Sequence, residues 1–155
     1  MTRSRLLTLT MLWLAVAFAS TLTEAASKRI HVTALVVQQA FIGDPAMPQI
    51  GDRLITSVEL FDDHQTQVGT GGGVCTVVTI PPLDPREECL LTAAFAEGQI
   101  SFGGLAPLAE VGAVARFGIM GGTDDFRKAR GDAILVISAP DVIDVTLDLD
   151  LPVWP

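Results

Sequence analysis

The 155-residue chain has no tyrosine, and its other aromatic side chains are seven Phe and two Trp. So few rings argue against a surface that stacks nucleic-acid bases or sugars. Basic residues are scarce too, because ten Lys and Arg face eighteen Asp and Glu, which gives a net charge of -8. With no basic cluster to offset this repulsion, we expect no nucleic-acid partner and no binding to an anionic membrane.

Metal-binding and nucleophile motifs are also absent. The sequence contains neither a Gly-x-Ser-x-Gly elbow nor a phosphate-binding glycine loop. His31 and His64 are far apart and isolated from Cys or clustered carboxylates, so metal-ligand spacing is missing. Alternate acidic residues near the C-terminus favour the solvated face of a strand over a calcium site. We therefore predict no metal site.

Residues 1–26 have the pattern of a secretory signal peptide. Arg3 and Arg5 form a basic start, and an apolar run over residues 6–19 follows. That run is short for a bilayer span, although an uncleaved anchor is the alternative. We predict a leader over 1–26 and a single domain over 27–155. The mature protein is then expected to be secreted, extracellular or periplasmic, and not held in a membrane.

The mature chain alternates in the manner of β-strands and shows no helical stripe. Residues 141–151 are the clearest case, with apolar and polar side chains taking turns. In the first strand, regular alternation places Val32 and Ala34 on one face and Gln39 and Phe41 on the other. Eight strands with frequent turn signals predict an all-β sandwich or an up-and-down barrel. The expected strands are 29–42, 52–61, 68–80, 89–95, 99–102, 111–119, 130–138 and 141–151.

One stretch carries a specific pattern. Gly121 to Gly131 reads Gly-Gly-Thr-x-x-Phe-x-x-Ala-Arg-Gly, which couples a glycine turn to a strand. This run resembles the signature of plant dirigent proteins and of the related allene oxide cyclase barrel superfamily. Three upstream segments resemble the same families: Gly51 to Asp62, Val68 to Cys75, and Gly98 to Gly104.

The resemblance implies an eight-stranded antiparallel β-barrel, calycin-like, with an apolar cavity, no cofactor, and a homo-oligomer that is a trimer or dimer. It implies a protein that binds a small hydrophobic molecule and steers its cyclisation or coupling, as an isomerase or cyclase does. Strict allene oxide cyclase activity is not expected, because residues 28–43 contain no carboxylate where those enzymes have a first-strand Glu. The alternatives are a non-catalytic, lipocalin-like carrier of apolar molecules and a barrel filled by its own side chains.

Four residues are candidates for the site. Asp125 and Arg130 match the Asp and Arg of the dirigent signature, so the resemblance makes them a catalytic pair in which Asp125 takes a proton. The alternative is a structural ion pair that holds the turn against the strand. Gln39, which could hold a water molecule, and Phe117 are the candidate binding residues.

Cys75 and Cys89 are an even pair in a chain expected to be exported, so a disulfide is predicted. Strand register argues the other way. If Ile80 faces Glu87, Cys75 lies opposite Thr92 and Cys89 opposite Val78, too far apart to bond. Two separately buried thiols are therefore the alternative.

Overall fold

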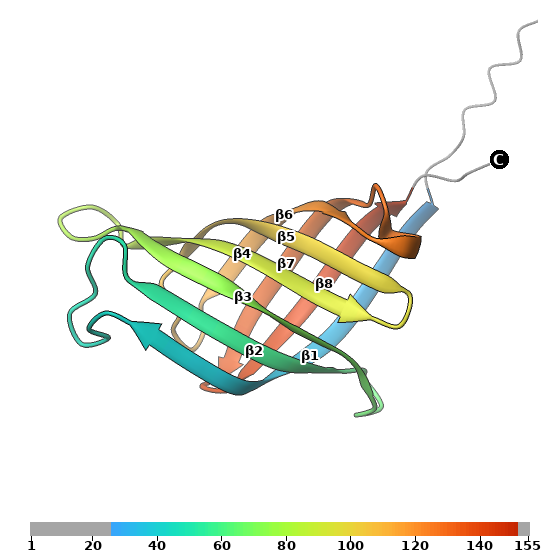
Figure 1. Cartoon of the computed structure of the whole chain (residues 1–155), viewed down its shortest axis with the longest axis horizontal. Coiled ribbons are helices and arrows are strands. Elements are labelled where there is room, and N and C mark those ends of the chain that lie inside the picture. The colour runs from blue at the N-terminus through green and yellow to red at the C-terminus, as the bar shows by residue number, and fades with distance from the viewer. Residues whose placement is uncertain (1–25, 152–155) are drawn as a thin grey trace, which may run out of the picture.

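The computed structural model describes residues 26–151, which form one closed antiparallel barrel with its strands in sequence order (Figure 1). The predicted all-β, eight-stranded barrel is confirmed. The leader expected over 1–26 lies outside the described residues apart from Ala26, where the first strand begins. Within the described range, no helix is long and apolar enough to cross a bilayer. The elements are β1 (Ala26–Ile42), β2 (Arg53–Phe61), β3 (Gln67–Thr79), β4 (Arg86–Phe95), β5 (Gly98–Pro107), β6 (Val114–Gly122), η1 (Asp124–Phe126), β7 (Arg130–Ala139) and β8 (Val142–Leu151).

Alternation along the strands sorts side chains between the inside and the outside of the barrel, as expected for β8. Val145, Leu147 and Leu149 are at most 5% exposed, and the acidic residues that alternate with or flank them, Asp144, Asp148 and Asp150, face outward. Asp148 lies directly opposite Arg29 of β1 and forms an ion pair with it on the outer surface. The acidic face of β8 is therefore a solvated exterior, as predicted.

The first strand departs from the predicted alternation. A bulge interrupts the β1–β2 register, because Val36 pairs with Val58 and Gln38 pairs with the next residue, Ser57. The extra residue, Val37, reverses the side-chain order that follows it. Gln39 and Phe41 consequently share the inner face with Val32, so the assignment of Gln39 and Phe41 to the opposite face was wrong.

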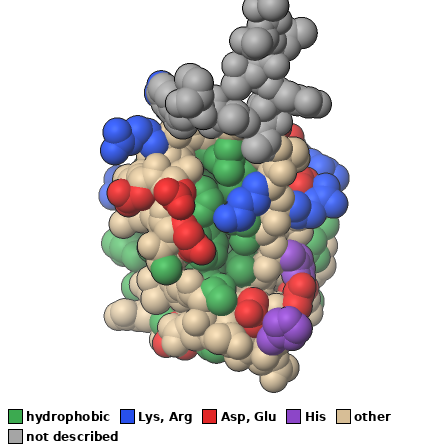
Figure 2. Space-filling view, turned by 90° about the vertical axis from the view of Figure 1, so that its right-hand side faces the viewer, with side chains coloured by type: hydrophobic (Ala, Val, Ile, Leu, Met, Phe, Trp, Pro, Cys, Tyr) green, Lys and Arg blue, Asp and Glu red, His purple; other side chains and the backbone are tan. Residues whose placement is uncertain are grey.

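One end of the barrel, here called the closed end, is packed solid. It carries η1 and the β4–β5 hairpin, on the right in Figure 1. Phe126 of η1 is 1% exposed; its ring meets Phe95 edge-on at 6.1 Å, and Lys28 Nζ lies 5.3 Å from its centroid. Figure 2 looks onto this end and shows charged side chains around a central apolar area. The Phe126 side chain, here called the plug, thus fills the barrel interior at the closed end.

The glycine motif that identified the family resemblance builds this plug. A Cβ added at Gly122 would collide with Gln99 and with Phe126. Gly131 has φ +126°, and a Cβ there would collide with the Asp148 carbonyl. Both positions need glycine because backbone approaches closely on each side. The motif therefore has a packing role at the closed end.

The opposite end, here called the open end, is formed by the loops 43–52, 80–85, 108–113 and 140–141. At this end β1 reaches beyond β8, whose ladder stops at the Leu35–Val142 pair. The Val36 amide still donates to the Asp141 carbonyl, but residues 37–42 pair with β2 alone. The resulting lip, residues 37–42 of β1 with residues 53–57 of β2, borders the mouth of the barrel, and its free edge is β1 because β2 continues the sheet to β3.

Candidate active site

A cavity of about 670 Å³ occupies the barrel interior from its middle to the open end. This volume suits a drug-sized ligand. Its wall is largely aliphatic and aromatic, and its rim comes from the open-end loops, including Pro45, Pro48 and Pro140. The interpretation of a barrel filled by its own side chains is therefore wrong for the open half and right for the closed end.

A small residue helps to keep the interior hollow. Gly71 of β3 sits between Val58 of β2 and Ala93 of β4, and all three line the cavity. A Cβ at Gly71 would lie 3.1 Å from Val58 Cγ2 and 3.0 Å from the Thr92 carbonyl oxygen. The wall at this point is therefore bare backbone, and a ligand can approach it closely.

Glu87 of β4 is the buried charged residue of the described chain, with 6% of its surface exposed. Its strand neighbours are Val77 and Ala106, which are buried and apolar, and all three line the cavity. Among the described residues its carboxylate has no hydrogen-bond or ion-pair partner. Burial raises the pKa of Glu87 from 4.5 to about 7, because the apolar surroundings penalise the charged form. Near neutral pH this carboxyl can therefore both accept and donate a proton.

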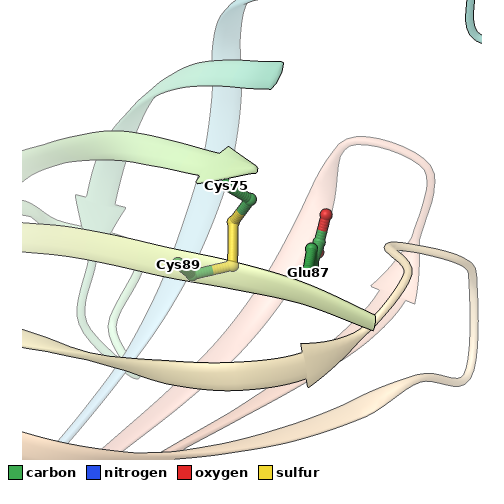
Figure 3. A group of neighbouring side chains, drawn as sticks. All are labelled: Cys75, Glu87 and Cys89. Carbon is green, nitrogen blue, oxygen red and sulfur yellow. A yellow bond between two sulfur atoms is a disulfide. The ribbon is translucent and has the colours of Figure 1, made fainter. Parts of the chain in front are cut away.

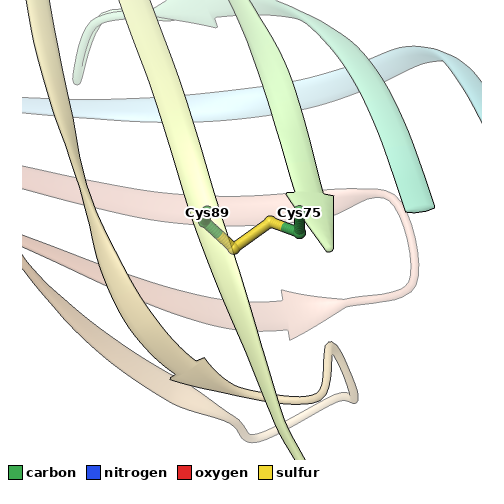
Figure 4. Close-up of a disulfide and its surroundings, with 2 residues drawn as sticks. All are labelled: Cys75 and Cys89. Carbon is green, nitrogen blue, oxygen red and sulfur yellow. A yellow bond between two sulfur atoms is a disulfide. The ribbon is translucent and has the colours of Figure 1, made fainter. Parts of the chain in front are cut away.

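The two cysteines meet beside Glu87. Cys75 pairs directly with Cys89 and bonds to it, with an S–S distance of 2.03 Å (Figure 4). The expected register was wrong because Thr79, not Ile80, closes the loop opposite Arg86, and a bulge at Val78 shifts the ladder further. The disulfide prediction is confirmed, and the alternative of two thiols is wrong.

The disulfide faces the cavity next to the carboxyl (Figure 3). Both sulfur atoms lie within 4.8 Å of a Glu87 carboxylate oxygen. Three such groups could share a metal ion if the cysteines were thiolates, but the S–S bond removes that option. The disulfide thus serves as a rigid, apolar part of the wall that ties β3 to β4 near the mouth.

Gln39 and Phe117 both line the cavity. Gln39 lies near the mouth on the lip, turned inward by the Val37 bulge. Phe117 is 3% exposed, and its ring centroid lies 6.2 Å from that of Phe102, another lining residue. Their contact with a ligand stays a prediction, but both lie where such a contact is possible.

Asp125 and Arg130 lie at the other end of the molecule. Both are exposed at the closed end, and neither lines the cavity. Arg130 Nη1 donates to the Ala129 carbonyl at 2.8 Å and to the Met120 carbonyl at 3.4 Å. The described residues show no ion pair between Arg130 and Asp125. A catalytic role for the pair remains a prediction without support from its placement.

Sequence reasoning missed Glu87, although a signal was present. Glu87 precedes Cys89, Leu91 and Ala93 at alternate positions, and all four line the cavity. The strand was expected to begin at Cys89, whereas β4 begins at Arg86. Extending the alternation two residues upstream would have turned Glu87 inward.

Comparisons with known proteins agree with this architecture. The family model described as an allene oxide cyclase barrel-like domain matches residues 28–142. No curated protein gives a significant match. A solved structure of a pyocyanin demethylase is 27% identical, with a TM-score of 0.67 over 78% of this chain and 99% of that one.

Two further solved structures show the same fold at lower identity. AbnU, described as an exo-specific intermolecular Diels-Alderase, is 17% identical, with a TM-score of 0.69 over 80% of this chain and 98% of that one. A nonspecific heme-binding cyclase of neoabyssomicin biosynthesis is 19% identical, with a TM-score of 0.67 over 85% and 69%. In the present chain the lining residues include no His, Met, Tyr or free Cys that could ligate a heme iron. On the family match and the closed barrel, the chain belongs to the allene oxide cyclase barrel-like domain family.

Proposed function

We propose that this protein is a cyclase- or isomerase-type catalyst for a small apolar molecule, with Glu87 as its proton-transfer group. The observation that carries the proposal is one buried carboxyl of raised pKa, unpaired among the described residues, in the wall of a largely apolar cavity. Such a group can take a proton from a bound molecule and return it at another atom. A positioned acid or base of this kind contributes roughly 10²–10⁴-fold to a rate.

The cavity adds confinement to this acid–base chemistry. A flexible substrate held by Phe102, Phe117 and Leu54 would lose most of its extended conformers before it reacts. Cyclisation gains from this effect because the two reacting ends are brought together inside one enclosed space. No step of the proposal requires a bound cofactor, because the chain's own residues supply both the confinement and the proton transfer.

The structural neighbours support a small organic substrate. Their descriptions name a Diels-Alderase, a cyclase and a pyocyanin demethylase, which are different reactions within the same kind of barrel. The fold alone therefore does not choose the reaction, and the choice depends on the groups in the cavity wall. In this chain those groups are Glu87 in the wall, Glu110 at the mouth, and a few neutral polar side chains such as Gln39 and Thr56.

We also propose that the protein works outside the cytosol. The leader pattern over residues 1–26 supports export, and the Cys75–Cys89 disulfide is of the kind that persists in oxidising compartments. Substrate would then meet the protein in the periplasm or outside the cell.

The test uses 5-nitrobenzisoxazole, a small neutral aromatic compound that reports on a base in an apolar site. Removal of its C3 proton breaks the ring N–O bond and gives a cyanophenolate, whose absorbance is followed. We expect a rate on the order of 10²-fold above that of a free carboxylate, rising with pH around the Glu87 pKa. Glu87→Gln should abolish this excess, and the outward-facing neighbour variant Glu88→Gln should retain it.

Retention of the full excess rate by Glu87→Gln would refute Glu87 as the proton-transfer group. Binding of the neutral dye N-phenyl-1-naphthylamine without any elimination would favour the non-catalytic carrier instead. Failure to bind that dye would show that the cavity does not accept apolar molecules.

A further inference from the structure

The charged side chains that line the cavity are all acidic. Two carboxylates line it, Glu87 in the wall and Glu110 on the β5–β6 loop at the mouth. No Lys, Arg or His belongs to the lining among the described residues. Two arginines belong to the open-end strand termini but not to the lining. Arg86 forms an ion pair with Asp84, and the Arg53 side chain is exposed. An anionic ligand would therefore meet no counter-charge.

The aromatic side chains of the wall add a second attraction for positive charge. Phe41, Phe102 and Phe117 line the same cavity, and the last two are paired at 6.2 Å. The face of an aromatic ring carries negative electrostatic potential and attracts cations, most strongly where water is excluded. The Glu87 carboxylate and the three phenyl rings therefore all favour a cationic group in the cavity.

We infer that, among small and largely apolar molecules, the cavity selects a ring compound bearing one positive or readily protonated nitrogen, with that nitrogen at Glu87 and the ring against the phenylalanines. This inference rests on the proposed function and names its substrate class. The contact is a charge-assisted hydrogen bond from the ligand N–H to the Glu87 carboxylate, which is stronger than a bond between neutral groups. A carboxylate such as a fatty acid is the class that this wall disfavours.

The inference also predicts how binding depends on pH. Ionised Glu87 attracts the cation, so affinity rises as pH rises through the Glu87 titration. The groups packed around Glu87 are Val77 and Ala106 on the adjacent strands and the Cys75–Cys89 disulfide, none of which titrates. Glu110 is the other titratable group of the lining, so a Glu110→Gln variant separates the two contributions.

The experiment measures affinity for three probes of matched shape: 2-naphthylmethylamine, 2-naphthylmethanol and 2-naphthoate. They are cationic, neutral and anionic at pH 8, and titration calorimetry on the purified chain gives each dissociation constant. We expect the amine to bind about 10-fold to 100-fold more tightly than the alcohol, and the naphthoate to bind most weakly. Glu87→Gln, which keeps the shape of the side chain, should bring the amine to the level of the alcohol, whereas Glu88→Gln should not.

Equal affinities for amine and alcohol, or tighter binding of the naphthoate, would overturn the inference while leaving the cavity and its proton chemistry in place. Loss of the amine preference in Glu110→Gln with full retention in Glu87→Gln would overturn the assignment to Glu87. If none of the probes binds, the proposed function falls together with the inference.

Discussion

The two ends of this barrel are built from the same eight strands, but side chains fill the closed end whereas the open end encloses a cavity. At the closed end Ile100, Phe126 and Leu149 are at most 1% exposed, and none of them lines the cavity. At the open end Phe41, Leu54 and Ile137 are only partly buried and border empty space. The difference shows that solid packing and the cavity occupy different halves of one sheet.

The family motif belongs to the stable half. Gly122 and Gly131 leave room for Phe126 at the closed end, while the cavity is lined by residues of all eight strands and of the open-end loops, and by no residue of the motif over 121–131. A recognisable motif is therefore evidence for the fold, and the chemistry must be sought at the other end.

We expect the largest effect from a substitution that disrupts the packing of the closed end. Phe126→Ala removes a fully buried ring and should lower the free energy of unfolding by about 3–5 kcal/mol. The matched variant Phe41→Ala borders the cavity already and should cost about 1 kcal/mol. Urea denaturation compares the two, and similar losses would contradict the division between the ends.

Removing the Cys75–Cys89 disulfide near the mouth should have the next largest effect on the free energy of unfolding. The double variant Cys75→Ala/Cys89→Ala frees a connection whose ends are 14 residues apart in sequence, and we expect a loss of about 2–3 kcal/mol. Thermal unfolding of the wild type with and without a reducing agent is the companion measurement. A change below 1 kcal/mol in both would show that the strand ladder alone holds this region.

Glu87 should make stability depend on pH. Its pKa is raised from 4.5 to about 7, so the folded chain holds this proton more firmly than the unfolded chain does. The stabilisation is complete below pH 4.5 and is lost as pH rises to about 7. Allowing for water that enters the cavity, we expect a loss of about 1–2 kcal/mol. Glu87→Gln should remove this part of the pH dependence in urea melts at pH 5 and pH 8, and an unchanged dependence would argue against burial of the charge.

The smallest effect is expected from the exposed pair of the closed end. Asp125→Asn and Arg130→Ala lie outside the cavity, so their benzisoxazole rates should stay within about twofold of wild type. Any larger fall in either variant, with stability unchanged, would restore the catalytic role that the dirigent resemblance implied.

The alternation of apolar and polar residues in the sequence predicts the strands but not the bulges that interrupt them. Alternation located the strands, and over residues 141–151 it separated the buried Leu147 and Leu149 from the acidic residues of the outer face. It failed where one residue breaks the period: the bulges at Val37 and Val78 turned Gln39 inward and brought Cys75 opposite Cys89. Neither bulge residue is a Gly or a Pro, so local composition gave no warning.

The site was harder to predict than the fold for a second reason. One of two adjacent Glu residues at a strand start resembles any solvent-facing carboxylate until the register places it between Val77 and Ala106. The motif residues Asp125 and Arg130 were named instead because local pattern is all that a sequence displays. Proximity across strands arises only when the barrel closes.

The lip at the mouth has a consequence for motion. Residues 38–42 are paired with β2 on one side and with no strand on the other, so moving them away breaks the hydrogen bonds of one ladder only. Segments with solvent-exposed backbone bonds open at the lowest free energy. Amide hydrogen exchange should therefore be fastest here and slowest around Leu147. If the cavity takes a ligand, as proposed, the segment with Gln39 and Phe41 is the part of the wall that we expect to move most easily on its entry and release.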